Sequence, residues 1–263
     1  MVMNMSADDV GSVLAERLEE AVQAALTDFC RRRLDGLKSL KLKDVLARKN
    51  PYLFRATGVQ EAAEIVKELL AAHVSSSDEG IFGDAFFEPI ARIFSNGTVA
   101  GSKGVDVIVE TDDTYKAIAV KSGPNIFNSS QAARQDDEFR ELRQRLSKMH
   151  KKFDPIVAAC YGRVPAKSKA KHNYRRVAGQ QFWHELTGDP DFYLKLMSLM
   201  KDYPQQHRLE FQLEWSNAVN RFTQEFLNDF SSTGAIDWEK LLRFNSGVEA
   251  PPRPRRKTNV EQI

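Results

Sequence analysis

The stretch that most constrains the fold lies between Gly104 and Gly123. Val105–Val109 alternates valines with other residues, and Tyr115–Val120 is a second run of strand-forming residues. The polar segment Thr111–Thr114 between them is typical of a turn, so the two runs predict a β-hairpin. Ser122-Gly123-Pro124 then interrupts regular structure at the end of the second strand. A chain containing this hairpin must build a sheet rather than a purely helical bundle.

Helical periodicity surrounds the hairpin. Apolar stripes predict helices over residues 7–37, 42–48, 60–73, 83–94, 130–151, 179–186, 191–200 and 210–230. We expect Gly36 to end the first helix and the polar run Ser75–Asp78 to end the third. Pro155–Tyr161 is short and apolar, as in a buried strand. The order of elements predicts an α/β (α+β) fold. We expect an N-terminal helical region over 1–74, a core over 75–200, a C-terminal helical region over 201–247 and a disordered basic tail over 248–263.

The composition sets limits on the class of protein. With 38 basic and 36 acidic residues the net charge is only +2, which argues against a uniformly basic protein but permits a local basic surface. Such a surface is indicated between Arg163 and Arg176, where lysines and arginines occur without an acid. The two cysteines, Cys30 and Cys160, show no zinc or disulfide spacing. No signal peptide or membrane-spanning segment is apparent, so we expect a cytoplasmic protein with no membrane partner.

Asp106 and Lys121 carry the chemistry of the hairpin. Asp106 lies within the first predicted strand and Lys121 ends the second, so both side chains can meet at one edge of the sheet. Carboxylates are the ligands that Mg²⁺ prefers, and a lysine can orient a water molecule or neutralise developing charge. These two residues are therefore the minimum equipment for metal-assisted phosphodiester hydrolysis. A cross-strand salt bridge is the simpler alternative.

Several motifs resemble one family. The sequences GVDVI (104–108) and AVKSGPN (119–125), followed by NSSQ (128–131), resemble the PD-(D/E)XK core of a branch of type II restriction endonucleases. Segments 49–54, 82–88, 161–163 and 174–183 resemble further elements of that branch in the same order, so the resemblance extends from about residue 41 to 196. It implies a restriction-endonuclease-like core, in which helices flank a central mixed sheet, with extra N- and C-terminal helices.

The resemblance also exposes a departure. The family pattern has an acid two residues before the lysine, where this chain has Ala119. Because some members of the superfamily recruit a carboxylate from the preceding helix, Glu88 is the candidate replacement and Glu79 the second choice. The implied site then has Asp106, Glu88 and the main-chain carbonyl of Val120 as Mg²⁺ ligands. Asp106, Glu88 and Lys121 are the catalytic residues, and Lys121 orients the attacking water.

Residues near this site are candidate DNA contacts. Neutral donors and acceptors follow the lysine, and a basic stretch follows the third strand. The candidates are Ser122, Asn125, Asn128, Ser130, Gln131, Arg163, Lys167, Lys169, Lys171 and Arg175. For the group that opens the helix near residue 130, capping of the helix is an alternative role. His172 and Asn173 lie beside the basic stretch and are candidates for reading bases.

The favoured function is that of a magnesium-dependent type II site-specific endonuclease acting on double-stranded DNA. A twofold-related recognition site favours a homodimer with one active site per strand. A cognate DNA methyltransferase acting on the same site is a further expected partner. Ala119 favours the alternative of a catalytically weak or silent DNA-binding protein on the same fold. A repair nuclease would share the chemistry, and a helical interaction protein with a simple Asp106–Lys121 ion pair is the remaining alternative.

Overall fold

The computed structural model describes residues 7–95, 102–124, 127–164, 172–232 and 234–247. Two compact units are built from alternating parts of the chain. The first unit combines the N-terminal residues through Arg31 with Glu79–Gln206, and the second combines Arg32–Asp78 with the residues from His207 onward. Within the described ranges, no helix is both long and apolar enough to cross a membrane.

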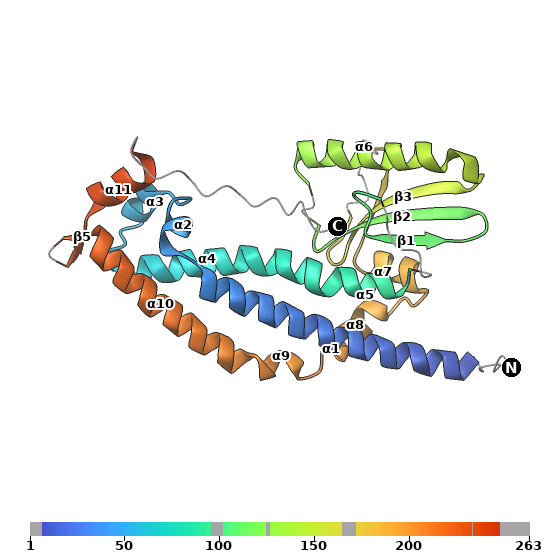
Figure 1. Ribbon diagram of the computed structural model, residues 1–263, viewed down its shortest axis with the longest axis horizontal. Helices are drawn as coiled ribbons and strands as arrows, with labels where there is room; N and C mark the ends of the chain where they lie inside the picture. The colour runs from blue at the N-terminus through green and yellow to red at the C-terminus, as the bar shows by residue number, and fades with distance from the viewer. Residues whose placement is uncertain (1–6, 96–101, 125–126, 165–171, 233, 248–263) are drawn as a thin grey trace. The chain divides into compact units, whose positions relative to one another are not determined.

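The helices and strands follow one another in the order of Figure 1. Two long helices, α1 (Ala7–Ser39) and α4 (Ala62–Phe82), each contribute residues to both units. The first unit also contains the π-helical turn η1 (Gly83–Phe87), α5 (Glu88–Ile93), β1 (Val107–Glu110), β2 (Thr114–Lys121), α6 (Ser129–Arg145), the 3-10 turn η2 (Leu146–Met149), β3 (Lys152–Ala159), β4 (Arg175–Ala178), α7 (Gln180–Thr187), α8 (Phe192–Leu199) and α9 (Tyr203–Gln206).

The sheet of the first unit is mixed, in the order β1-β2-β3-β4. Strands β1 and β2 form the predicted antiparallel hairpin, with Val107 opposite Ile118. Strand β3 lies parallel to β2, with Ile156 opposite Ile118, and β4 lies parallel to β3, with Val177 opposite Ala158. Parallel neighbours need a crossover connection, and α6 provides the one between β2 and β3. The fold is therefore α/β with a central mixed sheet flanked by helices, as predicted.

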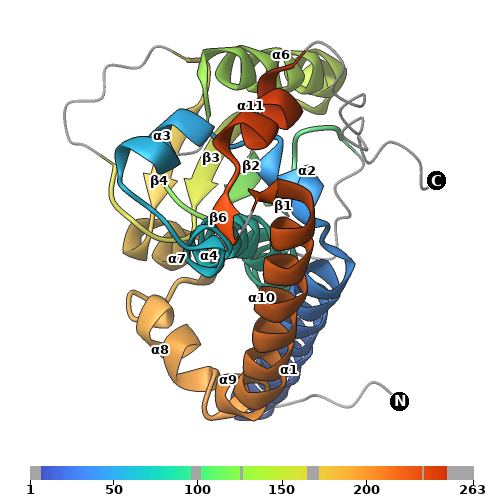
Figure 2. The ribbon, with the colours of Figure 1, turned by 90° about the vertical axis from the view of Figure 1, so that its left-hand side faces the viewer.

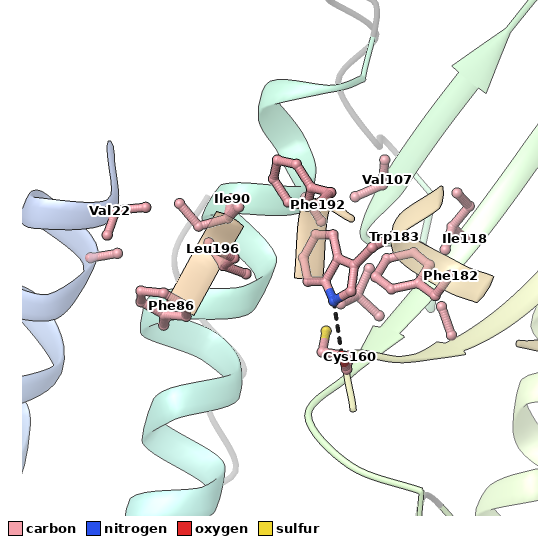
Figure 3. Close-up of a cluster of buried hydrophobic side chains, with 14 of the residues drawn as sticks. Val22, Phe86, Ile90, Val107, Ile118, Cys160, Phe182, Trp183, Phe192 and Leu196 are labelled. Atoms are coloured by element: carbon pink, nitrogen blue, oxygen red, sulfur yellow. Dashed lines mark hydrogen bonds between the residues drawn. The ribbon is translucent and has the colours of Figure 1, made fainter. Parts of the chain in front are cut away.

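Helices cover both faces of this sheet (Figure 1). On one face, Phe139 and Leu142 of α6 pack against apolar side chains such as Val157 of β3. On the other, α5, α7, α8 and the first part of α1 pack against alternate residues of the same strands. Figure 3 shows this second cluster, in which the indole nitrogen of Trp183 donates a 2.9 Å hydrogen bond to the main-chain oxygen of Cys160. Burial on both faces explains why β2 and β3 read as apolar runs.

The second unit is helical apart from a small β-ribbon. It contains the later part of α1 and most of α4, together with α2 (Leu42–Leu46), α3 (Pro51–Ala56), α10 (Arg208–Phe230), β5 (Ser231–Ser232), β6 (Ala235–Ile236) and α11 (Trp238–Ser246). Its core gathers Leu42, Ile65 and Leu69 from the first stretch of chain with Phe222 and Phe226 of α10. Figure 2 shows α11 beyond the C-terminal end of α10.

Several predicted boundaries were wrong. Gly36 does not end α1, which continues to Ser39. A glycine inside a helix costs only the entropy of fixing its backbone, and a long helix tolerates this cost. The polar run Ser75–Asp78 does not end α4, which continues to Phe82, because Val74 before the run and Phe82 after it each pack against an apolar cluster. Strand β4 was missed because it is only four residues long and begins with two arginines.

The sequence predicts three consecutive regions over residues 1–247, whereas each of the two units combines two separate stretches of the chain. The predicted boundary near residue 74 lies close to Asp78, but the residues through Arg31 group with the sheet-containing unit. The physical reason is that Leu18, Val22 and Leu26 of α1 are buried in the cluster on the sheet. The predicted tail over 248–263 lies outside the described residues.

Candidate active site

Asp106 lies immediately before β1. Its main-chain N–H donates to the carbonyl of Ile118 at 2.9 Å, so β2 already holds the backbone here. Gly104, two residues earlier, has a φ of +73°, and its carbonyl accepts a 2.8 Å hydrogen bond from the buried side chain of Gln135 on α6. The Asp106 carboxylate then accepts a 2.8 Å hydrogen bond from the N–H of Val120. The entry of β1 therefore fixes both the backbone and one carboxylate oxygen of Asp106.

Lys121 is the last residue of β2, and its side chain meets Asp106 as the hairpin predicts. Its Nζ lies 3.6 Å from Oδ2 of Asp106. Both side chains are partly exposed, and such pairs contribute little to stability, typically about 0–1 kcal/mol. The ion pair therefore adds little to the stability of the fold. Its significance is that it places an ammonium group beside a carboxylate at the end of β2.

The π-helical turn before α5 positions Glu88. In a π turn the hydrogen bond spans five residues, and here the N–H of Glu88 donates to the carbonyl of Gly83. Glu88 thus stacks over Gly83, a place that Phe87 would take in a regular α-helix. Gly83 itself lies against the sheet, because a Cβ added to it would lie 3.2 Å from Cβ of Ser122. The extra residue in the turn brings the Glu88 carboxylate to the side of the helix that faces the end of β2.

The charge environment of Glu88 is unusual. Burial raises the pKa of this carboxyl from 4.5 to about 7, and the negative charges of Asp106 and Asp84 add to the rise. The positive charges of Arg92 and Lys121 oppose it. Close carboxylates resist ionising together, so a cation is the natural partner for them. Perturbed carboxyls of this kind are concentrated at functional sites.

The residues present fit a Mg²⁺ ion. Among the described residues, Oδ1 of Asp106 and Oε1 of Glu88 have no hydrogen-bond donor, since Val120 and Arg92 bond to the other oxygen of each group. The N–H and C=O of a strand residue point the same way, so the Val120 carbonyl is directed to the Asp106 side. In the described part of the chain no three His, Cys, Asp or Glu side chains form a metal cluster. Mg²⁺ does not require one, because it keeps several waters and uses one or two carboxylates.

Ala119 supplies nothing to this site. It is fully buried and belongs to the apolar cluster beneath α6, together with Ile108, Phe139 and Val157. The acid that the family pattern places there is therefore not replaced from β2. Glu88 lies on α5, which packs on the opposite face of the sheet, and Arg92 of the same helix contacts both Glu88 and Asp106.

Glu79, the second choice for that replacement, has a different set of partners. Its Oε1 accepts hydrogen bonds from Ser122 at 2.6 Å and from the hydroxyl of Tyr161 at 2.9 Å. Sequence reasoning missed Tyr161 as a site residue, and also Arg92, whose guanidinium contacts Glu88 at 3.0 Å and the Asp106 carbonyl at 3.4 Å. The spacing of Arg92 four residues after Glu88 on one helix was an available signal.

The candidate DNA contacts have varied surroundings. Asn128 and Gln131 form a capping box at the start of α6, in which each side chain accepts from the main-chain N–H of the other. Ser130 is exposed in the first turn, Arg163 is exposed after β3, and Ser122 donates to Glu79. Asn125, Lys167, Lys169 and Lys171 lie outside the described residues.

Arg175 is held by two carboxylates of its own unit. Its guanidinium bonds Asp154 at 2.8 Å through two nitrogens and also bonds both oxygens of Glu185. Lys116 reaches the same glutamate at 3.3 Å. This network offsets the charge of Arg175 inside the protein, so it is poorly placed to bind phosphate. The neighbouring candidate His172 is similarly engaged, because its Nδ1 lies 2.6 Å from Asp136.

One comparison with known proteins gives a match to a family. A family model described as "Type II restriction endonuclease EcoO109I" matches residues 16–207, which is most of the chain. A search of curated proteins found no match. The matched region contains Asp106, Lys121 and Glu88 together with all strands of the mixed sheet. The chain belongs to the EcoO109I family of type II restriction endonucleases, a family of site-specific nucleases of double-stranded DNA.

Proposed function

We propose that this protein hydrolyses phosphodiester bonds of double-stranded DNA at a specific site with Mg²⁺, and that Glu88 takes the place of the acid missing at Ala119. The observation that carries the proposal is the convergence of two carboxylates from different elements. The Arg92 guanidinium contacts the Glu88 carboxylate at 3.0 Å and the Asp106 carbonyl at 3.4 Å, and each carboxylate keeps an oxygen without a donor among the described residues.

Metal binding and orientation of the attacking water are assigned to different residues. Asp106, Glu88 and the carbonyl of Val120 would hold the ion. When bound, Mg²⁺ lowers the pKa of a water ligand and offsets charge on the phosphate. Lys121, 3.6 Å from Asp106, presents an ammonium group that can donate a hydrogen bond to the attacking water and stabilise developing negative charge. No covalent enzyme intermediate is needed, so no activated serine or cysteine is required.

Two partners complete the proposal. A duplex target with twofold-related strands favours a homodimer, because each subunit then cuts one strand. A nuclease of this kind also requires protection of host DNA, which implies a methyltransferase for the same site. Sedimentation of the free protein and of its DNA complex tests the first expectation.

Plasmid cleavage tests the nuclease assignment. Wild type, Glu88→Ala and a matched control, Glu68→Ala, are compared with Mg²⁺ and with EDTA; Glu68 is an exposed glutamate of α4. We expect discrete Mg²⁺-dependent fragments from wild type and the control, and loss of cleavage in Glu88→Ala. Full cleavage by Glu88→Ala would remove Glu88 from the site. Binding of many DNA sequences without cutting would favour a silent DNA-binding protein, the alternative that Ala119 suggests.

A further inference from the structure

Glu79 connects three separate parts of the first unit. It lies on α4, whereas its hydrogen-bond partners Ser122 and Tyr161 follow β2 and β3. Both hydroxyls donate to the same carboxylate oxygen, Oε1. One exposed glutamate therefore ties a helix to the ends of two neighbouring strands.

The two loops that Glu79 contacts are also joined to each other. The N–H of Cys160 donates to the carbonyl of Lys121 at 2.9 Å, and the N–H of Tyr161 donates to that of Ser122 at 3.3 Å. The tyrosine side chain lies directly over Gly123, where an added Cβ would overlap its ring. The Tyr161 ring therefore packs directly on the backbone two residues after Lys121.

The same helical segment carries Glu88. Gly83 follows Glu79 by four residues, so both lie on one side of the helix, and Gly83 packs against Ser122. The π turn then stacks Glu88 over Gly83. Glu79, Gly83 and Glu88 thus form one line along the helix, with Glu79 and Gly83 both in contact with Ser122.

We propose that Glu79 is a positioning residue that, through the hydroxyls of Ser122 and Tyr161, fixes the helix bearing Glu88 against the strand end bearing Lys121. This inference rests on the proposed nuclease function for its kinetic consequence. It assigns Glu79 a role through its neighbours and excludes it as a metal ligand. Small displacements of catalytic groups reduce rates strongly, by about 100-fold for about 1 Å.

Single-turnover cleavage with substitutions at Glu79 tests the proposal. Glu79→Ala should lower the rate by about 10- to 100-fold, with unchanged DNA affinity in EDTA and an unchanged Mg²⁺ concentration for half-maximal rate. Glu79→Gln keeps an acceptor oxygen and should restore the rate to within about threefold of wild type. In a Ser122→Ala/Tyr161→Phe background, Glu79→Ala should have little further effect, because its partners are gone.

Hydrogen exchange gives a readout that does not depend on cleavage. Glu79→Ala should speed exchange at the amides of Cys160 and Tyr161, while Glu79→Gln and the control Glu68→Ala should not. If wild type does not cut, the nuclease proposal fails, and exchange alone decides whether Glu79 fixes the loops. A Glu79→Gln rate as low as that of Glu79→Ala, rescue of Glu79→Ala by added Mg²⁺, or unchanged exchange would each overturn the positioning role.

Discussion

Replacing Glu88 by glutamine should stabilise the metal-free protein at high pH. The folded state raises the pKa of this carboxyl from 4.5 to about 7 through burial and the charges of Asp106 and Asp84. Between these two pH values the folded protein binds a proton that the unfolded chain has released, so the free energy of unfolding falls as the pH rises. Above pH 7 the ionised Glu88 carries the full cost. The amide of the Glu88→Gln variant is neutral throughout and avoids this cost.

The size of the effect follows from the shift. A rise from 4.5 to about 7, at about 1.4 kcal/mol per pKa unit, gives an upper value of about 3 kcal/mol. Glu88→Gln should therefore be more stable than wild type by up to about 3 kcal/mol at pH 8 and nearly equal to it at pH 4.5. Mg²⁺ should reduce the difference in stability between Glu88→Gln and wild type at pH 8, because it should bind and stabilise wild type but not the variant, which lacks the Glu88 carboxylate.

Urea denaturation in EDTA at pH 4.5 and pH 8 measures the difference. Trp183, fully buried in the sheet-containing unit, reports on the unfolding of that unit. Glu68→Gln on the exposed surface of α4 serves as the control and should show no pH-dependent gain. A difference between Glu88→Gln and wild type that is the same at both pH values would refute the reasoning, since no shifted carboxyl would then exist.

Three further results are expected. Asp106→Ala and Lys121→Ala should each lower cleavage by at least about 100-fold with DNA binding largely retained, as measured by single-turnover assays and fluorescence anisotropy; normal cutting by either would contradict the assignment. At limiting Mg²⁺ the cleavage rate should rise as Glu88 ionises near pH 7, and a profile flat from pH 5.5 to 8.5 would count against Glu88 as a ligand. Gly104→Ala should lower stability by about 1–3 kcal/mol in thermal or urea unfolding, because of its φ of +73°, whereas Gly80→Ala, with open space around it, should be neutral or stabilising. An unaffected Gly104→Ala would show that this turn does not constrain the entry of β1.

Local sequence patterns determined the Asp106–Lys121 pair of the candidate site. Alternation over Val105–Val109 and the apolar run Tyr115–Val120 specify a hairpin through side-chain period alone. Once that hairpin forms, Asp106 and Lys121 lie at the same end of it, with Nζ of Lys121 3.6 Å from Oδ2 of Asp106. The α/β class followed from the order of elements for the same reason: periodicity and turn residues act over a few neighbouring positions.

Tertiary structure decided the partners of the other candidate site residues. Arg175 looks like a phosphate ligand in the sequence, but Asp154 and Glu185, from β3 and α7, hold its guanidinium. For Asn128 and Gln131 the sequence allowed either DNA contact or helix capping, and the structure shows them in a capping box at the start of α6. Each outcome depends on which partner arrives at hydrogen-bond distance, and for Arg175 those partners come from other elements.

The position of Glu88 shows most clearly the difference between what local sequence determines and what packing determines. Its acidic side chain was a candidate from the family resemblance, but a helical wheel with regular spacing would put Phe87 over Gly83. The π turn shifts that place by one residue, and Gly83 fits closely against Ser122 at the end of β2. The sequence by itself determined the hairpin of β1 and β2, strand β3 and the Asp106–Lys121 pair, because these depend on local periodicity. Only the packing of the helix on the sheet decided that Arg92 contacts both Glu88 and Asp106 and that Glu79 bonds to two hydroxyls, because both depend on contacts between elements distant in the chain.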